Sequence, residues 1–170
     1  MPDGSLTLVL GGARSGKSAH AERLASAGLG PWRYIATGQA FDEEMRARIA
    51  AHRARREEGW HTVEAPHDLA ATLEAVPGGQ AVLVDCLTLW LSNRLLAGAD
   101  LEAESDRLAA VLGAPRGPWV AVANEVGLGI VPDNGLARQF RDAAGHLNQK
   151  VAARADRVLF MVAGLAMTVK

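Results

Sequence analysis

Short apolar runs alternate with longer amphipathic stretches along almost the whole chain. The runs predicted as strands are 6–10, 33–37, 62–65, 81–84, 119–123, 158–162 and 166–169. The stretches predicted as helices are 19–27, 42–58, 69–76, 87–96, 101–112 and one from residue 133 or 134 to about 154. Nearly continuous apolar strands between helices predict an α/β fold, with a mostly parallel sheet covered by helices on both faces. The last run, which follows Gly164, is expected to be an antiparallel edge strand.

Length and composition narrow the class of protein further. The chain has 170 residues, with neither repeats nor a linker, so we predict one domain spanning residues 1–170. A net charge of -1 gives no basic field for nucleic acid. No apolar run approaches the ~18 residues of a membrane span, and the N-terminus lacks a signal-type pattern. We therefore expect a cytoplasmic protein that binds neither nucleic acid nor membrane.

The single cysteine excludes an internal disulfide and a cysteine-based zinc site. Cys86 directly follows the end of an apolar strand. A thiol in that position is more often a core residue than a nucleophile.

The first strand leads into the pattern G-x-x-x-x-G-K-[ST], which is the phosphate-binding P-loop. Its eight residues are Gly11, Gly12, Ala13, Arg14, Ser15, Gly16, Lys17 and Ser18. Glycines let backbone N–H groups surround phosphate oxygens, and the next helix points its positive end at the same anion. Lys17 adds a charge for the outer phosphates, and the Ser18 hydroxyl is a ligand for Mg²⁺. The pattern predicts a nucleoside triphosphate site.

Two further strand ends carry polar residues. Asp85 ends the strand 81–84 and occupies the position where P-loop proteins hold Mg²⁺, although an aspartate there can also cap the next element. Glu125 follows the strand 119–123. Ligands of open α/β sheets lie beyond the carboxyl ends of the strands, so Glu125 is expected to share a crevice with Lys17 and Asp85. The alternative is a glycine-containing loop without chemistry.

The predicted helix 42–58 carries a basic face. Arg48, His52 and Arg55 lie at i, i+4 and i+7 and therefore on one side of the helix. A neutral imidazole is a nucleophile toward phosphorus, and guanidinium groups match phosphate oxygens. The alternative is a solvated helix face. His20, near the start of the P-loop helix, either helps to close the site or lies on the surface.

Several motifs together resemble one family. They are the P-loop at 11–18, Tyr-Ile-Ala-Thr at 34–37, the spacing from Met45 through His52 to Glu64, Asn-Glu-Val-Gly-Leu-Gly-Ile-Val-Pro at 124–132 and Arg-Gln-Phe-Arg-Asp at 138–142. The chain resembles, over essentially its whole length, the bifunctional adenosylcobinamide kinase / adenosylcobinamide-phosphate guanylyltransferase family of cobalamin assembly. The combination is far more specific than the P-loop alone.

The resemblance implies a RecA-like P-loop fold, a homotrimer and two reactions. The first phosphorylates the aminopropanol hydroxyl of adenosylcobinamide, with ATP or GTP as donor. The second transfers GMP from GTP to that phosphate, which gives adenosylcobinamide-GDP and pyrophosphate. The family carries GMP on a histidine, and the matching residue here is His52, so His52 and Lys17 are the expected catalytic residues.

The resemblance also implies further nucleotide contacts. Beyond the P-loop they are Ala36, Thr37, Gly38, His52, Arg53, Ala54, Arg55, Glu64 and Asp85. Mg²⁺ is expected on Ser18 and Asp85. The chain departs from some relatives at Ala51, where they carry a second histidine, so His52 is the single candidate acceptor on its predicted helix.

Two other functions remain open at this point. One is a P-loop small-molecule kinase in which His52 is an ordinary helix residue. The other is a nucleotide-binding switch or assembly protein, which should carry an N-K-x-D-like segment; Asn124-Glu125-Val126-Gly127 lacks its lysine and aspartate. The sequence does not specify the kinase donor, the residues that contact the corrin ring or the order of the steps.

Overall fold

The computed structural model describes residues 4–39, 43, 47 and 58–170. Within these residues one seven-stranded sheet has the order β3-β2-β4-β5-β1-β6-β7. The strands are β1 (Ser5–Gly11), β2 (Trp32–Ala36), β3 (Trp60–Glu64), β4 (Val82–Asp85), β5 (Pro118–Asn124), β6 (Arg157–Val162) and β7 (Leu165–Thr168). All neighbours pair in parallel except β6 and β7, which are antiparallel. Both the mostly parallel sheet and the antiparallel edge strand are thus confirmed.

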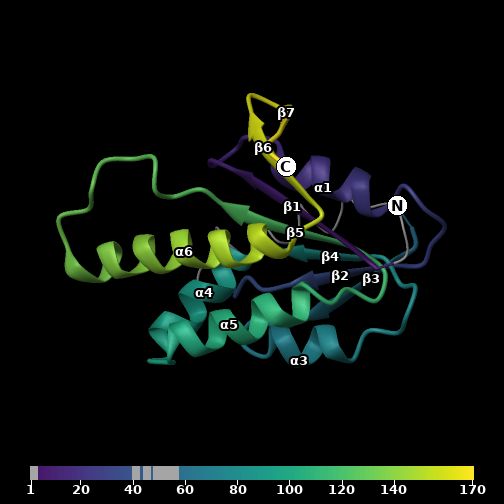
Figure 1. The fold of residues 1–170 in the computed structure, drawn as a ribbon, viewed down its shortest axis with the longest axis horizontal. Coiled ribbons are helices and arrows are strands. Elements are labelled where there is room, and N and C mark those ends of the chain that lie inside the picture. The colour runs from purple at the N-terminus through teal and green to yellow at the C-terminus, as the bar shows by residue number, and fades with distance from the viewer. Residues whose placement is uncertain (1–3, 40–42, 44–46, 48–57) are drawn as a thin grey trace.

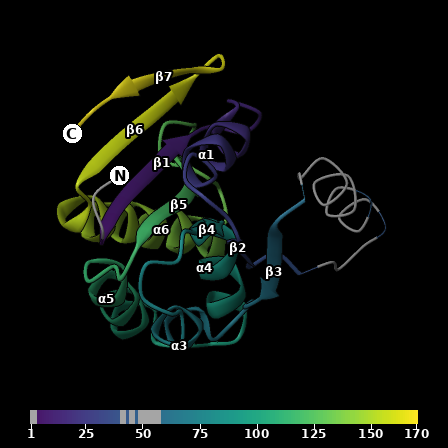
Figure 2. The same ribbon diagram turned by 90° about the vertical axis from the view of Figure 1, so that its right-hand side faces the viewer.

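Helices cover both faces of the sheet, as predicted. They are α1 (Lys17–Ala25), α3 (Leu69–Glu74), α4 (Leu87–Leu96), α5 (Leu101–Leu112) and α6 (Gly135–Arg154). Figures 1 and 2 show α1 on one face and α3 to α6 on the other. Asn134 caps α6, because its side chain accepts a hydrogen bond from the backbone N–H of Ala137. Most of the predicted helix 42–58 lies outside the described residues.

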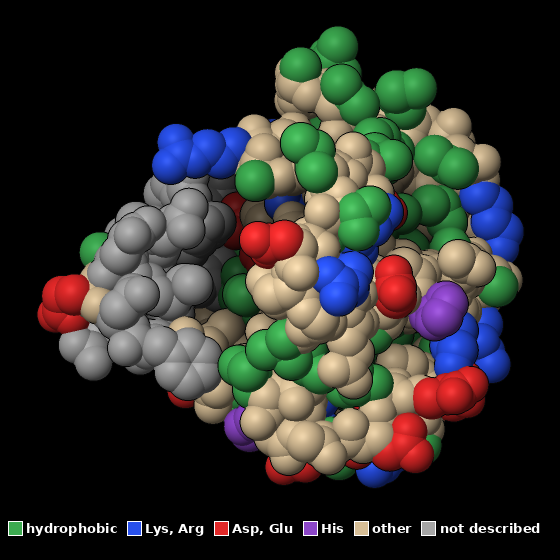
Figure 3. Space-filling view, turned by 90° about the vertical axis from the view of Figure 1, so that its left-hand side faces the viewer, with side chains coloured by type: hydrophobic (Ala, Val, Ile, Leu, Met, Phe, Trp, Pro, Cys, Tyr) green, Lys and Arg blue, Asp and Glu red, His purple; other side chains and the backbone are tan. Residues whose placement is uncertain are grey.

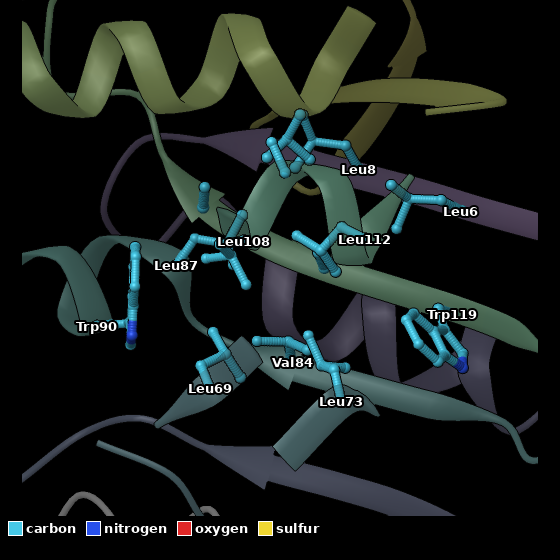
Figure 4. Packing of buried hydrophobic residues seen from close by; sticks show 14 of the residues in the cluster. Leu6, Leu8, Leu69, Leu73, Val84, Leu87, Trp90, Leu108, Leu112 and Trp119 are labelled. Carbon is cyan, nitrogen blue, oxygen red and sulfur yellow. The ribbon is translucent and has the colours of Figure 1, made fainter. Parts of the chain in front are cut away.

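The sheet separates two apolar clusters because successive side chains of a strand point to opposite faces. On β1, Leu6 and Leu8 belong to the cluster under α3 to α6, whereas Val9 belongs to the cluster under α1. Figure 4 shows the larger cluster, in which Trp90 and Trp119 are the largest fully buried side chains. Burying each large side chain contributes roughly 1.5–3 kcal/mol. The packing fixes the helices and hence the loops between them.

The strand order places the described strand ends that carry predicted chemistry at one edge. Because β1 to β6 run in parallel, their carboxyl ends share one side of the sheet, which we call the carboxyl edge. One strand, β5, separates the P-loop strand β1 from β4, which ends at Asp85. This is the RecA-like arrangement of a P-loop protein. None of the helices in the described ranges is both long and apolar enough to cross a membrane.

Candidate nucleotide-binding site

The P-loop joins the end of β1 to the start of α1, and two of its glycines occupy positions that disfavour a side chain. A Cβ on Gly11 would lie 2.5 Å from the Oγ of Ser15. Gly16 caps α1 with φ 90°, a left-handed conformation that disfavours other residues. A Cβ there would lie 3.2 Å from the Cα of Gly164, whose N–H bonds the carbonyl of Ser15 at 3.0 Å. The turn between β6 and β7 therefore packs against the P-loop.

Polar groups of the P-loop are available to an anion. The Nζ of Lys17 donates to the carbonyl of Gly12 at 3.0 Å, so the ammonium group already lies over the loop. The Oγ of Ser15 is buried and has no hydrogen-bond partner in the described structure. A phosphate oxygen would compete with the Gly12 carbonyl for the lysine and give the serine a partner. These features fit a phosphate site.

Asp85 lies at the carboxyl edge and is held by a neighbouring strand. The Oη of Tyr34 donates a hydrogen bond to its Oδ2 at 2.9 Å. Tyr34 is buried, and its ring packs edge-on against Trp60. The sequence placed Tyr34 in a family motif but predicted no partner for its hydroxyl, although a buried phenol usually needs one.

Cys86 is confirmed as a core residue, and nearby charges affect the pKa of its thiol. Burial, together with the adjacent Asp85 carboxylate, raises the pKa of the Cys86 thiol to about 12, and Lys17 opposes this rise. Lys17 and Asp85 therefore both act on the same buried residue. Lys17 follows β1 and Asp85 ends β4, so both lie at the carboxyl edge although 68 positions separate them in the sequence.

The turn at residues 36–38 is anchored from within the protein. Thr37 is fully buried, and its Oγ1 donates to the Cys86 carbonyl at 2.6 Å and accepts from the Cys86 N–H at 2.9 Å. The Thr37 carbonyl accepts a bond from Asn93 at 2.8 Å. The Thr37 side chain is therefore engaged within the protein, whereas Ala36 and Gly38 on either side of it are half-buried.

Glu64 and Glu125 both lie at the carboxyl edge. Glu64 ends β3 and pairs in register with Ala36. The N–H of Glu125 bonds the carbonyl of Gly11 at 3.1 Å, and its Oε1 accepts from the N–H of Gly127 at 2.8 Å. The Glu125 backbone thus touches the P-loop while its side chain stabilises its own turn. Figure 3 looks onto this edge and shows acidic and basic side chains exposed together.

Several predicted residues lie elsewhere or outside the description. His52, Arg53, Ala54 and Arg55, together with Arg48, lie outside the described residues. His20 is half-buried on α1 beside Arg23, with 3.3 Å between its Nδ1 and the guanidinium. Slight burial, Arg23 and Arg157 lower the His20 pKa. These contacts favour the surface interpretation of His20.

The oxygen donors at the edge fit Mg²⁺. Among the described residues no cluster of three or more histidine, cysteine or acidic side chains could form an all-protein metal cage. Mg²⁺ instead takes one or two protein oxygens and completes its shell with phosphates and water. Asp85, oriented by Tyr34, and Ser18, in the first turn of α1, are donors of this kind.

A strand, glycine loop and helix with Lys17, and a carboxylate two strands away on a RecA-like sheet, define a P-loop nucleotide-binding protein. Comparison with known proteins narrows this class. Residues 7–169 match the family model described as cobinamide kinase / cobinamide phosphate guanyltransferase. The chain belongs to this family, and it is therefore an enzyme of the transferase class.

Curated relatives cover nearly the whole chain. It is 52% identical over 166 residues to the bifunctional adenosylcobalamin biosynthesis protein CobP of Pseudomonas aeruginosa, with 96% of each chain covered. The chain is 41% identical over 181 residues to the bifunctional adenosylcobalamin biosynthesis protein CobU of Escherichia coli. It is 42% identical over 182 residues to the CobU protein of Salmonella typhimurium. In both cases 97% of this chain and 99% of the relative are covered. The family predicted from the sequence is confirmed.

Proposed function

We propose that a single nucleotide site, built around Lys17, serves both the cobinamide kinase and the guanylyltransferase reactions of this family. The observation that carries the proposal is the convergence of the P-loop, Asp85 and the 36–38 turn on one edge of one sheet. A domain of this size has one P-loop, so both donors must use it. The substrates are adenosylcobinamide, its phosphate, and ATP or GTP.

In the kinase step the aminopropanol hydroxyl of adenosylcobinamide attacks the γ-phosphorus. An O–P bond forms, the bond to the leaving nucleoside diphosphate breaks, and the hydroxyl proton is lost. P-loop N–H groups and the Lys17 ammonium neutralise the charge on the phosphate oxygens. For this, Lys17 must exchange its bond with Gly12 for one with phosphate.

In the guanylyl step the proposed nucleophile is a ring nitrogen of His52. It attacks the α-phosphorus of GTP, forms an N–P bond and expels pyrophosphate. A phosphate oxygen of adenosylcobinamide phosphate then attacks the same phosphorus, breaks the N–P bond and yields adenosylcobinamide-GDP. Arg55 and Arg53 would hold phosphate oxygens, with Ala54 and Glu64 as further nucleotide contacts.

Mg²⁺ is the metal proposed for the site, held by the Asp85 carboxylate and the Ser18 hydroxyl. When bound, it would supply positive charge for the phosphate oxygens. Tyr34 fixes the orientation of the carboxylate in advance, so fewer conformations are lost on binding.

We also propose a homotrimer located in the cytoplasm. Exposed apolar side chains offer surface that subunit contacts would cover: Leu165 and Met167 on β7, and Leu128, Ile130 and Val131 after β5. A cytoplasmic location follows from the need for ATP and GTP. Sedimentation of the purified protein tests the oligomeric state.

Labelled GTP tests the proposed function directly. The protein is incubated with GTP carrying label at the α- or the γ-phosphate, then denatured and freed of small molecules. We expect the chain to retain α-label and no γ-label. When adenosylcobinamide is added, γ-label should appear in adenosylcobinamide phosphate. A protein that phosphorylates adenosylcobinamide and never transfers GMP would be a monofunctional kinase, contrary to the proposal.

A further inference from the structure

The turn between β6 and β7 makes a hydrogen bond to the P-loop. Val162 and Leu165 pair in register, so the turn has two residues, Ala163 and Gly164, with φ of 50° and 83°. Positive φ at both positions is the pattern of a type I′ turn. The N–H of Gly164 donates to the carbonyl of Ser15 at 3.0 Å. The bond joins two segments that are far apart in the sequence.

Strand β6 fixes the position of this turn. Met161 pairs in register with Gly11, the first residue of the P-loop, so the turn follows at the carboxyl edge beside that loop. Leu159 and Met161 are buried in the cluster under α1. At the other end of the hairpin, the N–H of Val158 donates to the carbonyl of Lys170 at 3.0 Å. Figure 2 shows the hairpin beside β1. The hydrogen bond to the P-loop therefore comes from a segment that is itself held in place.

The bond from Gly164 fixes the orientation of the peptide group between Ser15 and Gly16. In a trans peptide the carbonyl and the N–H point in opposite directions. Because the Ser15 carbonyl faces the hairpin, the Gly16 N–H faces away from it. That N–H has no hydrogen-bond partner among the residues that the structure describes. It is therefore a free donor held in one direction, in a loop whose N–H groups are the expected ligands of phosphate.

Other hydrogen bonds hold the two ends of the loop. The N–H of Glu125 donates to the Gly11 carbonyl at 3.1 Å, where the loop leaves β1. The N–H of His20 donates to the Gly16 carbonyl at 3.0 Å, where the loop enters α1. Neither bond involves the peptide group between residue 15 and residue 16. Within the described part of the chain, the bond from Gly164 is the one backbone hydrogen bond to that group.

We infer that Gly164 is a positioning residue for the phosphates of the bound nucleotide, because its N–H holds the Gly16 N–H in the direction that a phosphate oxygen can meet. The inference rests on the proposed nucleotide site and adds to it a residue from outside the P-loop. Close approach is part of the device: a Cβ on Gly16 would lie 3.2 Å from the Cα of Gly164. Since one P-loop serves both donors in the proposed function, the effect should be the same for guanine and adenine nucleotides.

The test compares two substitutions at position 164, where a Cβ would meet no described atom within 4 Å. Asparagine tolerates a positive φ, whereas a β-branched valine does not. Calorimetry measures Kd for GDP and ADP, because neither is a donor in the proposed reactions. We expect Gly164→Val to raise both Kd values at least about tenfold, the effect of losing one hydrogen bond to a charged group, and Gly164→Asn to raise them less than about threefold. Ala163→Gly, which keeps the turn, is the matched control and should bind like the wild type.

Hydrogen exchange of the wild type is a second readout, which decides the matter even if Gly164→Val does not fold. GDP should slow exchange of the Gly164 amide at least about tenfold, because coupling between the phosphate and this bond is reciprocal. Peptides of α5, on the other face of the sheet, should exchange as before.

A turn that only stabilises the fold would lower the melting temperature of Gly164→Val and leave Kd unchanged. That result, or unchanged exchange at Gly164 with GDP bound, would overturn the inference. Binding is measured without turnover, so failure of either proposed reaction in the wild type is a separate result. If the wild type binds neither GDP nor ADP, the proposed nucleotide site and the inference are both wrong.

Discussion

Tyr34 donates a hydrogen bond to Asp85 across 2.9 Å and so joins strands β2 and β4 at the edge where the nucleotide is proposed to bind. The bond engages Oδ2 and orients the carboxylate before any ligand arrives. Partners behind a metal ligand commonly change metal affinity by about 10- to 100-fold. The buried phenol of Tyr34 thereby orients the carboxylate that is proposed to hold Mg²⁺.

Tyr34→Phe should therefore raise the Mg²⁺ concentration needed for half-maximal activity by about tenfold in both reactions, with little change in the rate at saturating Mg²⁺. The ring remains to pack against Trp60, so the fold should persist. Trp60→Phe is the control, because it alters the packing without removing the hydroxyl. An unchanged Mg²⁺ titration in Tyr34→Phe would contradict an orienting role.

Asp85→Asn should slow both reactions by about 100-fold and weaken their dependence on Mg²⁺, because the metal loses a charged ligand. The asparagine oxygen can still accept the bond from Tyr34, so the variant should fold. Rates are measured across a Mg²⁺ titration. If the variant keeps wild-type rates at every Mg²⁺ concentration, Asp85 only caps the element that follows β4. Glu125 would then be the candidate carboxylate for holding Mg²⁺.

Lys17→Ala should abolish both activities, at least about 100-fold each, because one P-loop lysine neutralises the phosphates of both donors. Lys150→Ala serves as the control: its ammonium pairs with Asp106 at 2.7 Å on another part of the molecule. The two reactions are assayed separately. Near-normal kinase activity in Lys17→Ala would show that the reactions do not share this site.

His52→Ala should take up no α-label while most kinase activity persists, since γ-phosphoryl transfer needs no histidine carrier. Label on the wild-type chain should be lost in acid and survive in base, as expected of an N–P bond. His146→Ala should behave like the wild type. Continued labelling of His52→Ala would identify another acceptor, with His20 the next to test.

Cys86 should resist alkylation in the native protein from pH 7 to pH 10. Its raised pKa of about 12 means that the thiol stays protonated across this range, and burial blocks reagents as well. Unfolding should restore ordinary reactivity with iodoacetamide, which mass spectrometry detects. Rapid modification of the folded protein at pH 8 would show that the β4–α4 junction opens in solution.

Much of this molecule could be predicted from the order of its residues. Apolar runs such as 6–10 and 119–123 became β1 and β5, because their length and continuity suit strands buried on both faces. The P-loop is recognisable as a local pattern of eight residues, although the approach of Gly164 to Gly16 is a contact that only the fold provides. The family, too, could be identified from spaced motifs.

Only the tertiary structure decided which distant residues support that site. Nothing in the local sequence pairs Tyr34 with Asp85, or Asn93 with Thr37 and Pro66; these contacts depend on the strand order β3-β2-β4 and on the packing of α4. Periodicity shows which face of an element is buried but not which element lies against it. Thr37 illustrates the difference: its motif predicts a nucleotide-binding turn, whereas packing buries its side chain and engages it with Cys86. Local patterns determined the chemistry at each strand end, and the parallel sheet, by bringing those ends to one edge, determined how they act together.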